Sequence, residues 1–465
     1  MEKHILSKST YIKGEQCLKQ LYLHKKRAFL RDRMPAERLA IFSRGTHIGL
    51  YAQELFPGGI DAGPKHPTQY RKAVEKTTQL LLDGQDVIYE AGFQADKTLI
   101  LLDILVRNGD QWDAYEVKSS KSLSETYYKD AALQYHVLAN AGINIRTFSL
   151  IHINPDYVRG EEIDIHQMFI ITDVTEEVGK RAARVAIKIE EEISTLESEH
   201  SPKVAIGAHC FVPYDCDFIG HCWKEVKRPA VFDIPSIGNQ QQFELYEQFK
   251  TINLLQNVFT LEEVQQTQIG VQISRKEHFN LSEKYISAIE QIKNNKSQYY
   301  AIKILSFTPA MPLYKDTKPY QQIAFAYAIM PINGDSNDVK LYVANGKENP
   351  HFEILDQIKQ LNNHEFLAFE NRVDLKQIFD LQQIIIDNCY YHPAMTKDYS
   401  NKSLSLSLGI KAPWKGIESD IVAAQFYDEI LRNHKNSEEK RTAINAYLIR
   451  ELLLVQKFVK KLSLN

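Results

Sequence analysis

Two acidic residues and a lysine interrupt strand-like sequence in the segment ILLDILVRNGDQWDAYEVKSS. They are Asp103, Glu116 and Lys118. If Gly109 and Asp110 form the two-residue turn of a hairpin, the pairing of the two strands places position 103 opposite position 116. The two carboxylates would then be neighbours roughly 5 Å apart. Lys118 returns to the same side of the sheet two residues later.

Facing carboxylates on apolar strands repel each other unless a cation lies between them. Mg²⁺ or Mn²⁺ suits such a site, because both accept carboxylate oxygens and leave positions for water and a phosphate oxygen. Lys118 would orient the attacking water or offset charge on the phosphate. The alternative is a surface pair of Glu116 and Lys118, with Asp103 as an edge-strand acid. The predicted metal ligands are Glu90, Asp103, Glu116 and Val117.

Three evenly spaced cysteines lie in the segment HCFVPYDCDFIGHCW as Cys210, Cys216 and Cys222, and the fourth candidate is Cys17. Zinc sites generally use closer pairs, so these wide gaps favour an iron-sulfur cluster over zinc. Zinc and buried free thiols remain the alternatives. Cys389 stands alone and is predicted to be a core residue.

Apolar periodicity predicts the elements that must position these side chains. A strand meander should lead into a strand-helix-strand crossover and a long charged helix. The expected helices are 13–29, 68–83, 124–141 and 174–198, and the expected strands are 87–93, 98–106, 112–118, 146–153 and 169–172.

The 465 residues are enough for two or three domains, and the formal net charge is −3. A partner that carries phosphates must therefore meet a local basic region. Residues 13–38 contain eight Lys or Arg and three acids, which indicates either such a region or a solvated helix face. The apolar runs are too short to span a bilayer, and the first residues lack a signal-peptide pattern. We expect a cytoplasmic protein that has no membrane contact.

An early cysteine, an acid, a Glu-x-Lys pair and a late cysteine triad follow one another in an order that resembles the iron-sulfur nucleases of the RecB-like PD-(D/E)XK superfamily. The resemblance covers about Lys3 to Trp223. It implies a [4Fe-4S] cluster on the four cysteines named above, and Gln134 in DAALQYHVLANAG as a further catalytic residue besides Asp103, Glu116 and Lys118. Related nucleases often place a metal-binding histidine where this chain has Gly49, and His47 lies nearby.

The whole chain resembles a bacterial family that fuses this module to a DEDD exonuclease-like domain, through segments such as LSKSTYIKGEQCLKQLYLHK and PLYKDTKPYQQIAFAYA. The resemblance implies an α/β fold with a PD-(D/E)XK (restriction-endonuclease-like) nuclease core and a C-terminal ribonuclease H-like domain. Lys303 and Leu305 stand where that second domain would carry its metal-binding Asp and Glu, so it is expected to be inactive. The expected domains are 1–228 for the nuclease, 229–297 for a helical connector and 298–465 for the degenerate exonuclease-like domain.

These patterns together predict a metal-dependent deoxyribonuclease that acts on single-stranded DNA or duplex ends. The second domain would serve as a scaffold, grip the substrate or bind a protein partner. The alternative is a non-enzymatic nucleic-acid-binding or assembly protein in which the iron-sulfur cluster is structural.

Overall fold

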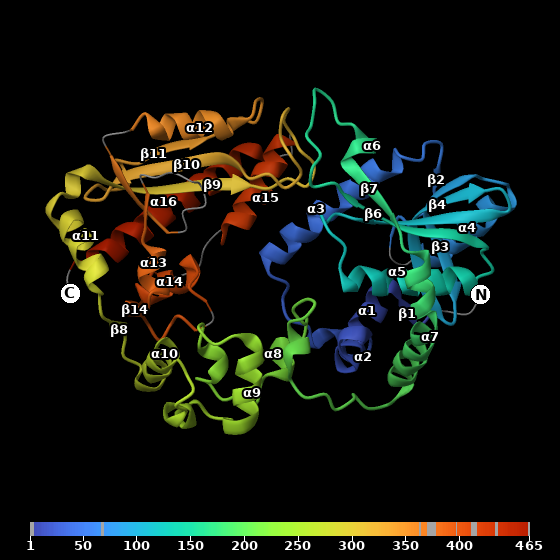
Figure 1. The fold of residues 1–465 in the computed structure, drawn as a ribbon, viewed down its shortest axis with the longest axis horizontal. Coiled ribbons are helices and arrows are strands. Elements are labelled where there is room, and N and C mark those ends of the chain that lie inside the picture. The colour runs from blue at the N-terminus through green and yellow to red at the C-terminus, as the bar shows by residue number, and fades with distance from the viewer. Residues whose placement is uncertain are drawn as a thin grey trace. The chain divides into compact units, whose positions relative to one another are not determined.

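The chain divides into two compact units, which are described separately (Figure 1). The computed structural model describes residues 4–66, 69–361, 364–369, 378–396, 398–410, 416–432 and 436–463, without the side chains of 41–47. The first unit comprises Met1–Lys224 together with Pro309–Gln321. The second comprises Glu225–Thr308 together with Gln322–Asn465.

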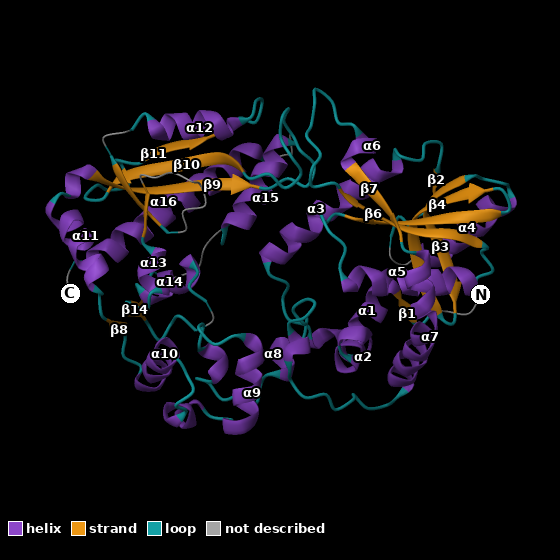
Figure 2. Ribbon diagram, in the orientation of Figure 1, coloured by secondary structure: helices purple, strands orange, loops and turns teal. Residues whose placement is uncertain are grey.

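A seven-stranded mixed sheet forms the centre of the first unit in the described residues (Figure 2). Its strand order is β2-β3-β4-β5-β6-β7, and β1 pairs with β4 off this path. β3, β4 and β5 form the predicted antiparallel meander, and β6 runs parallel to β5 after the predicted helical crossover. The strands are β1 (Leu6–Ser7), β2 (Ile60–Asp61), β3 (Val87–Ala95), β4 (Thr98–Asn108), β5 (Gln111–Lys118), β6 (Ile145–Ile153) and β7 (Phe169–Asp173).

The helices predicted over 68–83, 124–141 and 174–198 are confirmed, whereas α3 (Ala36–Gln53), α6 (Ile165–Met168) and α8 (Ile219–Cys222) were not predicted. The single helix expected over 13–29 is wrong, because the chain forms two helices that are separated at Cys17. Cys17 has extended backbone, with φ −164° and ψ 119°. The helices are α1 (Lys8–Gln16), α2 (Leu18–Lys26), α3 (Ala36–Gln53), α4 (Tyr70–Leu82), α5 (Glu125–Asn140), α6 (Ile165–Met168), α7 (Thr175–Glu197) and α8 (Ile219–Cys222).

Both faces of this sheet are covered, which explains why its strands are apolar on both sides. Residues of α1, α4, α5 and α7 pack on one face. In α7 the buried residues Val178, Val185 and Ile189 recur at helical spacing, so the helix has one apolar stripe. The other face packs against α3 and against Ala310 and Met311 of the returning segment Pro309–Gln321.

The predicted hairpin register is confirmed. Asn108 pairs with Gln111, which closes a two-residue turn over Gly109 and Asp110. Gly109 has φ +65°, a conformation that glycine adopts without steric cost. The ladder continues to its last pair, Ile104 with Tyr115, so positions 103 and 116 come next on the two strands.

The second unit is built on a five-stranded sheet of order β11-β10-β9-β12-β13 in its described residues. Its strands include β9 (Tyr299–Phe307), β10 (Ile323–Pro331), β11 (Lys340–Val343), β12 (Glu365–Ala368) and β13 (Ile378–Asp380). β8 (His278–Phe279) and β14 (Tyr390–Tyr391) pair separately. Its helices are α9 (Asn239–Phe249), α10 (Glu263–Ser274), α11 (Glu283–Asn294), α12 (Pro350–Lys359), α13 (Gln382–Ile386), α14 (Asn401–Ser407), α15 (Asp420–Leu431) and α16 (Ser437–Leu462).

Helices α12, α15 and α16 pack against β9 and β10 of that sheet. The mixed α/β class is therefore confirmed for the chain, while the predicted domain assignments stay predictions. Within the described ranges, no helix combines the length and apolarity needed to cross a bilayer.

Candidate functional site

Asp103 and Glu116 lie side by side at the centre of the first unit's sheet. The N–H of Val117 donates a hydrogen bond to Asp103 Oδ2, with an N···O distance of 2.6 Å. Glu116 is only 2% exposed. Burial, together with the adjacent Glu116, raises the pKa of Asp103 well above its usual value. The hairpin thus places two carboxylates next to each other in a buried site.

Glu90 extends this pair into a row of three carboxylates across β3, β4 and β5. The flanking pairs Tyr89–Ile104 and Ala91–Leu102 place Glu90 beside Asp103. Its φ is +50°, an uncommon conformation for a residue with a long side chain. Such a conformation costs on the order of 1–3 kcal/mol and persists where the surroundings enforce it. Burial, with a contribution from Glu116, raises the pKa of Glu90.

Lys118 lies on the same side of β5 as Glu116, as predicted, and also contacts a carboxylate that the sequence analysis missed. Its Nζ is 2.7 Å from Glu116 Oε1 and donates a second hydrogen bond to Asp130 on α5. Burial disfavours the ammonium form, but Asp130 and Glu116 outweigh it and raise the pKa of Lys118. The ring of Tyr127 lies 5.2 Å from this ammonium group. Asp130 is the first residue of the DAALQ segment that drew attention to Gln134.

A second lysine, Lys8 at the start of α1, also enters the site. Its Nζ is 2.6 Å from Glu116 Oε1 and 3.7 Å from Asp130 Oδ2. Although burial opposes its charge, Asp130, Glu116 and Asp103 raise the pKa of Lys8. Glu116 responds in the opposite sense: burial opposes its ionisation, but Lys118 and Lys8 hold its pKa below the usual range. No sequence signal connects residue 8 with residue 116.

Several polar atoms in this site have no hydrogen-bond partner among the described residues. They are Glu116 Oε2, Asp130 Oδ1 and both amide atoms of Gln134. Gln134 is fully buried and lies one turn after Asp130, on the same side of α5. Buried polar atoms are normally paired, so these atoms are available to bind a ligand, an ion or water.

A divalent cation is compatible with the oxygen atoms present. Asp103, Glu116 and the adjacent Glu90 supply carboxylates, and the main-chain carbonyl is the group that Val117 can offer. In the arrangement seen, Lys8 occupies part of the space among them. Within the part of the chain that is described, no group of three His, Cys, Asp or Glu side chains is arranged so that it could hold a metal ion.

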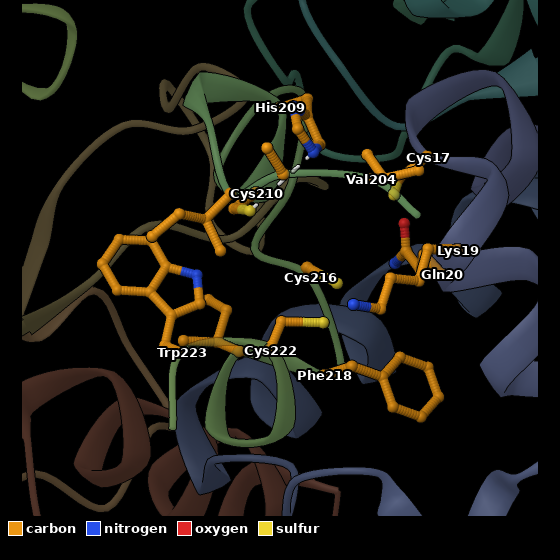
Figure 3. A pocket seen from close by; sticks show the side chains of 13 residues that line it. Cys17, Lys19, Gln20, Val204, His209, Cys210, Cys216, Phe218, Cys222 and Trp223 are labelled. Carbon is orange, nitrogen blue, oxygen red and sulfur yellow. Dashed lines mark hydrogen bonds between the residues drawn. The ribbon is translucent and has the colours of Figure 1, made fainter. Parts of the chain in front are cut away.

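The four predicted cysteines line one cavity (Figure 3). Cys17 comes from the break between α1 and α2, and the other three come from the 207–222 segment, with their sulfur atoms turned toward a shared space. Burial, with contributions from the other thiols, raises the pKa of Cys216 to about 12. Burial also raises the pKa of Cys222. Four thiols are the donor set that an iron-sulfur cluster uses, although among the described residues no three of these side chains are arranged so that they could hold a metal ion.

Hydrogen bonds also hold the cysteine segment against the N-terminal helices. Gln16 Nε2 donates to the carbonyls of His209 and Tyr214, each at 2.7 Å. Lys13 Nζ lies 2.6 Å from Asp217 Oδ2. Cys17 and the late cysteines are thus brought together by contacts that do not depend on the sulfur atoms.

Three further positions named in the sequence analysis are His47, Gly49 and Cys389. The side chain of His47 lies outside the described residues. Gly49, where related nucleases often have a metal-binding histidine, has open space beside it, since a Cβ added there would have no atom within 4 Å. Cys389 is 2% exposed, which confirms its prediction as a core residue.

In the second unit, Lys303 forms an ion pair. This lysine stands where the exonuclease-like domain that the chain resembles would carry a metal-binding Asp. Its Nζ lies 2.9 Å from Asp420 Oδ2, and the hydroxyl of Tyr447 donates to Asp420 Oδ1 at 2.7 Å. Glu451 Oε1 accepts a hydrogen bond from Arg450 Nη2 at 2.8 Å. The carboxylates of Asp420 and Glu451 are therefore both paired with groups of the protein.

Comparisons with known proteins gave a distant structural similarity. Neither the models of known protein families nor the curated proteins gave a match. Among solved structures, the chain is similar to an alkaline exonuclease from Laribacter hongkongensis, with 13% sequence identity and a TM-score of 0.22. That similarity covers 41% of this chain and 91% of the exonuclease. At this TM-score it carries no argument about fold or activity.

Proposed function

We propose that the first unit is a metal-dependent nuclease of PD-(D/E)XK type that hydrolyses DNA phosphodiester bonds. The observation that carries the proposal is the row of Glu90, Asp103 and Glu116 with Lys118 beside it. Asp103, Glu116 and the carbonyl of Val117 would hold Mg²⁺ or Mn²⁺, with Glu90 as a further ligand. A bound divalent ion would polarise a phosphate oxygen and lower the pKa of the attacking water.

The chain's own residues supply the rest of the proposed reaction. The Lys118 ammonium, oriented by Glu116 and Asp130, would donate a hydrogen bond to the attacking water or to the phosphate. Gln134, whose buried amide has no partner among the described residues, would orient the same water or a phosphate oxygen. Its amide can both donate and accept, which suits either role.

The four cysteines are proposed to bind a [4Fe-4S] cluster that fixes the fold around Cys17. Their common cavity supports this, and so does their origin in two segments far apart in the sequence. The second unit is proposed to be a ribonuclease H-like domain without catalytic activity. Lys303 paired with Asp420, together with the fully buried Leu305, supports that role, because neither residue could bind a cation.

The direct test compares Asp103→Asn and Lys118→Met with the parent protein. Both variants should lose Mn²⁺-dependent degradation of end-labelled DNA by at least about a hundredfold, the usual scale for removing a group that acts in the transition state. The iron absorbance should stay unchanged. Asp113→Asn is a matched control, because Asp113 is a buried carboxylate on the neighbouring strand β5 and pairs with Arg146 instead. Wild-type cleavage by both site variants would refute the assignment of the site.

A second candidate function is nucleic-acid binding without cleavage. It is favoured by the position of Lys8, whose ammonium group neutralises Glu116 without a metal. Under this alternative, anaerobically purified parent protein would bind single-stranded DNA and would not hydrolyse it with any divalent metal. A colourless anaerobic preparation that contains zinc would likewise replace the iron-sulfur proposal with a zinc site.

A further inference from the structure

The turn between α2 and α3 exposes a large aromatic side chain. Phe29 lies at the centre of the 3₁₀ turn η1 (Ala28–Leu30) and is 80% exposed. Its neighbour Leu30 instead packs against Tyr22 and Phe218. A single exposed phenyl ring is common on protein surfaces, so its significance here depends on the charges that surround it.

Cationic side chains surround this ring in the sequence and are exposed with it. They are Lys25, Lys26, Arg27, Arg31 and Arg33. Asp32 is the single acid between His24 and Arg33, and its Oδ2 accepts a hydrogen bond from the N–H of Gly220 at 2.8 Å. Asp32 is itself exposed, and its carboxylate is hydrogen-bonded to the cysteine segment, so the turn keeps a net positive charge at its surface.

The turn is held in place by the cysteine segment. The N–H of Asp32 donates to the carbonyl of Asp217 at 2.8 Å. Gly220 allows the side chain of Asp32 to come close to the cysteine segment, because a Cβ at position 220 would lie 2.3 Å from Asp32 Oδ1. Arg31 Nη2 lies 2.6 Å from His24 Nδ1, which orients its guanidinium group. Phe29 is thus presented on a fixed backbone, which reduces the entropy lost on binding.

We propose that residues 24–33 form a binding platform for single-stranded nucleic acid, on which Phe29 stacks against a base and the flanking Lys and Arg neutralise phosphates. A polyanion matches the cationic surroundings, and an aromatic ring can reach the face of a base when the strand is unpaired. In a duplex the base faces are stacked on each other, so the ring would add little. This inference rests on the proposed function and specifies its substrate as a single strand.

The test measures binding by fluorescence anisotropy, with full-length Asp103→Asn protein as the parent so that cleavage does not interfere. Phe29→Ala in this background should weaken binding of oligo-dT by about 5- to 100-fold, the range expected for losing one stacked base. Binding of a duplex of equal length should change little. Phe29→Trp should restore binding of oligo-dT, because the indole ring also stacks.

Matched controls separate stacking from general effects. Phe259→Ala removes a phenylalanine that is 93% exposed in the second unit and should leave binding unchanged. Lys26→Ala should weaken binding of oligo-dT and duplex alike and should reduce the salt dependence by about one phosphate contact.

The proposal is overturned if the parent does not bind oligo-dT, if Phe29→Ala binds it as tightly as the parent, or if Phe29→Ala loses duplex binding to the same extent. Loss of a protein partner with oligo-dT binding unchanged would assign the surface to that partner instead. Because binding is measured without cleavage, this outcome is independent of whether the parent enzyme hydrolyses DNA.

Discussion

Glu116 has two carboxylate oxygens in very different surroundings. Oε1 accepts hydrogen bonds from both Lys8 and Lys118, whereas Oε2 is buried and has no partner among the described residues. A carboxylate held by two ammonium groups stays ionised, which is the state that a metal ligand needs. Lys8 therefore both prepares this ligand and competes with any cation that approaches it.

Replacing Lys8 with methionine should tighten the binding of Mn²⁺. The change removes a positive charge close to Glu116, and repulsion at that distance accounts for about tenfold or more in affinity. Calorimetric titration with Mn²⁺ measures this directly. Lys13→Met is the control, because Lys13 pairs with Asp217 instead. Unchanged or weaker Mn²⁺ binding by Lys8→Met would contradict this view of the site.

The local part of this site could be predicted from the sequence and the distant part could not. Asp103 and Glu116 belong to one hairpin, whose turn residues fix the register between them. Lys8 reaches Glu116 across 108 residues of sequence, through the packing of α1 beside the sheet. No periodicity or turn pattern encodes such a contact, so the sequence analysis missed it.

At the level of elements, the N-terminal helix shows the limit of periodicity. Apolar residues continue at helical spacing through Cys17, yet the backbone there is extended and divides the segment into α1 and α2. The break allows the two helices to take different directions and leaves the Cys17 side chain at the cavity that the late cysteines share. Spacing reports which residues face the core, but not a change of direction at one residue.

The packing of α1 against α7 encloses the carboxyl group of Glu192. Glu192 is fully buried, and its two oxygens have no hydrogen-bond partner among the described residues. It lies against Gly14, where a Cβ would be 2.3 Å from its carboxyl carbon. Burial, reinforced by Glu15 and Glu191 and opposed by Lys188, raises its pKa to about 9.

Glu192 should make stability fall as pH rises. Below its unfolded pKa of about 4.5 the group is protonated in both states, so its titration does not change the free energy of unfolding. Between there and pH 9 the unfolded chain releases the proton and the folded chain keeps it, so the free energy of unfolding falls by up to about 1.4 kcal/mol per pH unit. Urea unfolding at several pH values should show this slope, and Glu192→Gln should lose it. An equal slope in both proteins would assign it to other groups.

At the level of the whole molecule, the chain returns to its first unit after most of that unit is complete. Residues Pro309–Gln321 connect β9 to β10 of the second unit, yet they belong to the first. Met311 lies in the first unit's core, Arg159 Nη1 donates to the carbonyl of Pro312 at 2.9 Å, and Tyr320 donates to the carbonyl of Ser119. The sequence analysis expected each domain to be one continuous stretch of chain. Composition does not reveal which unit a connecting segment packs against, so the return of Pro309–Gln321 to the first unit was not predicted.

This connection predicts the behaviour of a cut chain. A protease recognition sequence inserted after Lys224, cleaved in the folded protein, should give two fragments that co-elute on gel filtration. The later fragment still supplies Pro309–Gln321 to the unit formed by the earlier one. The same cut in an Arg159→Ala, Met311→Ser variant should give fragments that separate more readily. Complete separation in the unmodified background would show that the segment contributes no lasting attachment.

The same segment sets an order of events on the ribosome. Residues 1–224 emerge first, but Ala310 and Met311, which complete one side of their core, emerge only after residues 225–308 have been made. At about 5–20 residues per second, this leaves one side of the nascent sheet incompletely covered for roughly 4–17 s. Synthesis through β9 must therefore precede full burial of the sheet face that packs against α3, which exposes the nascent chain to chaperones during that interval.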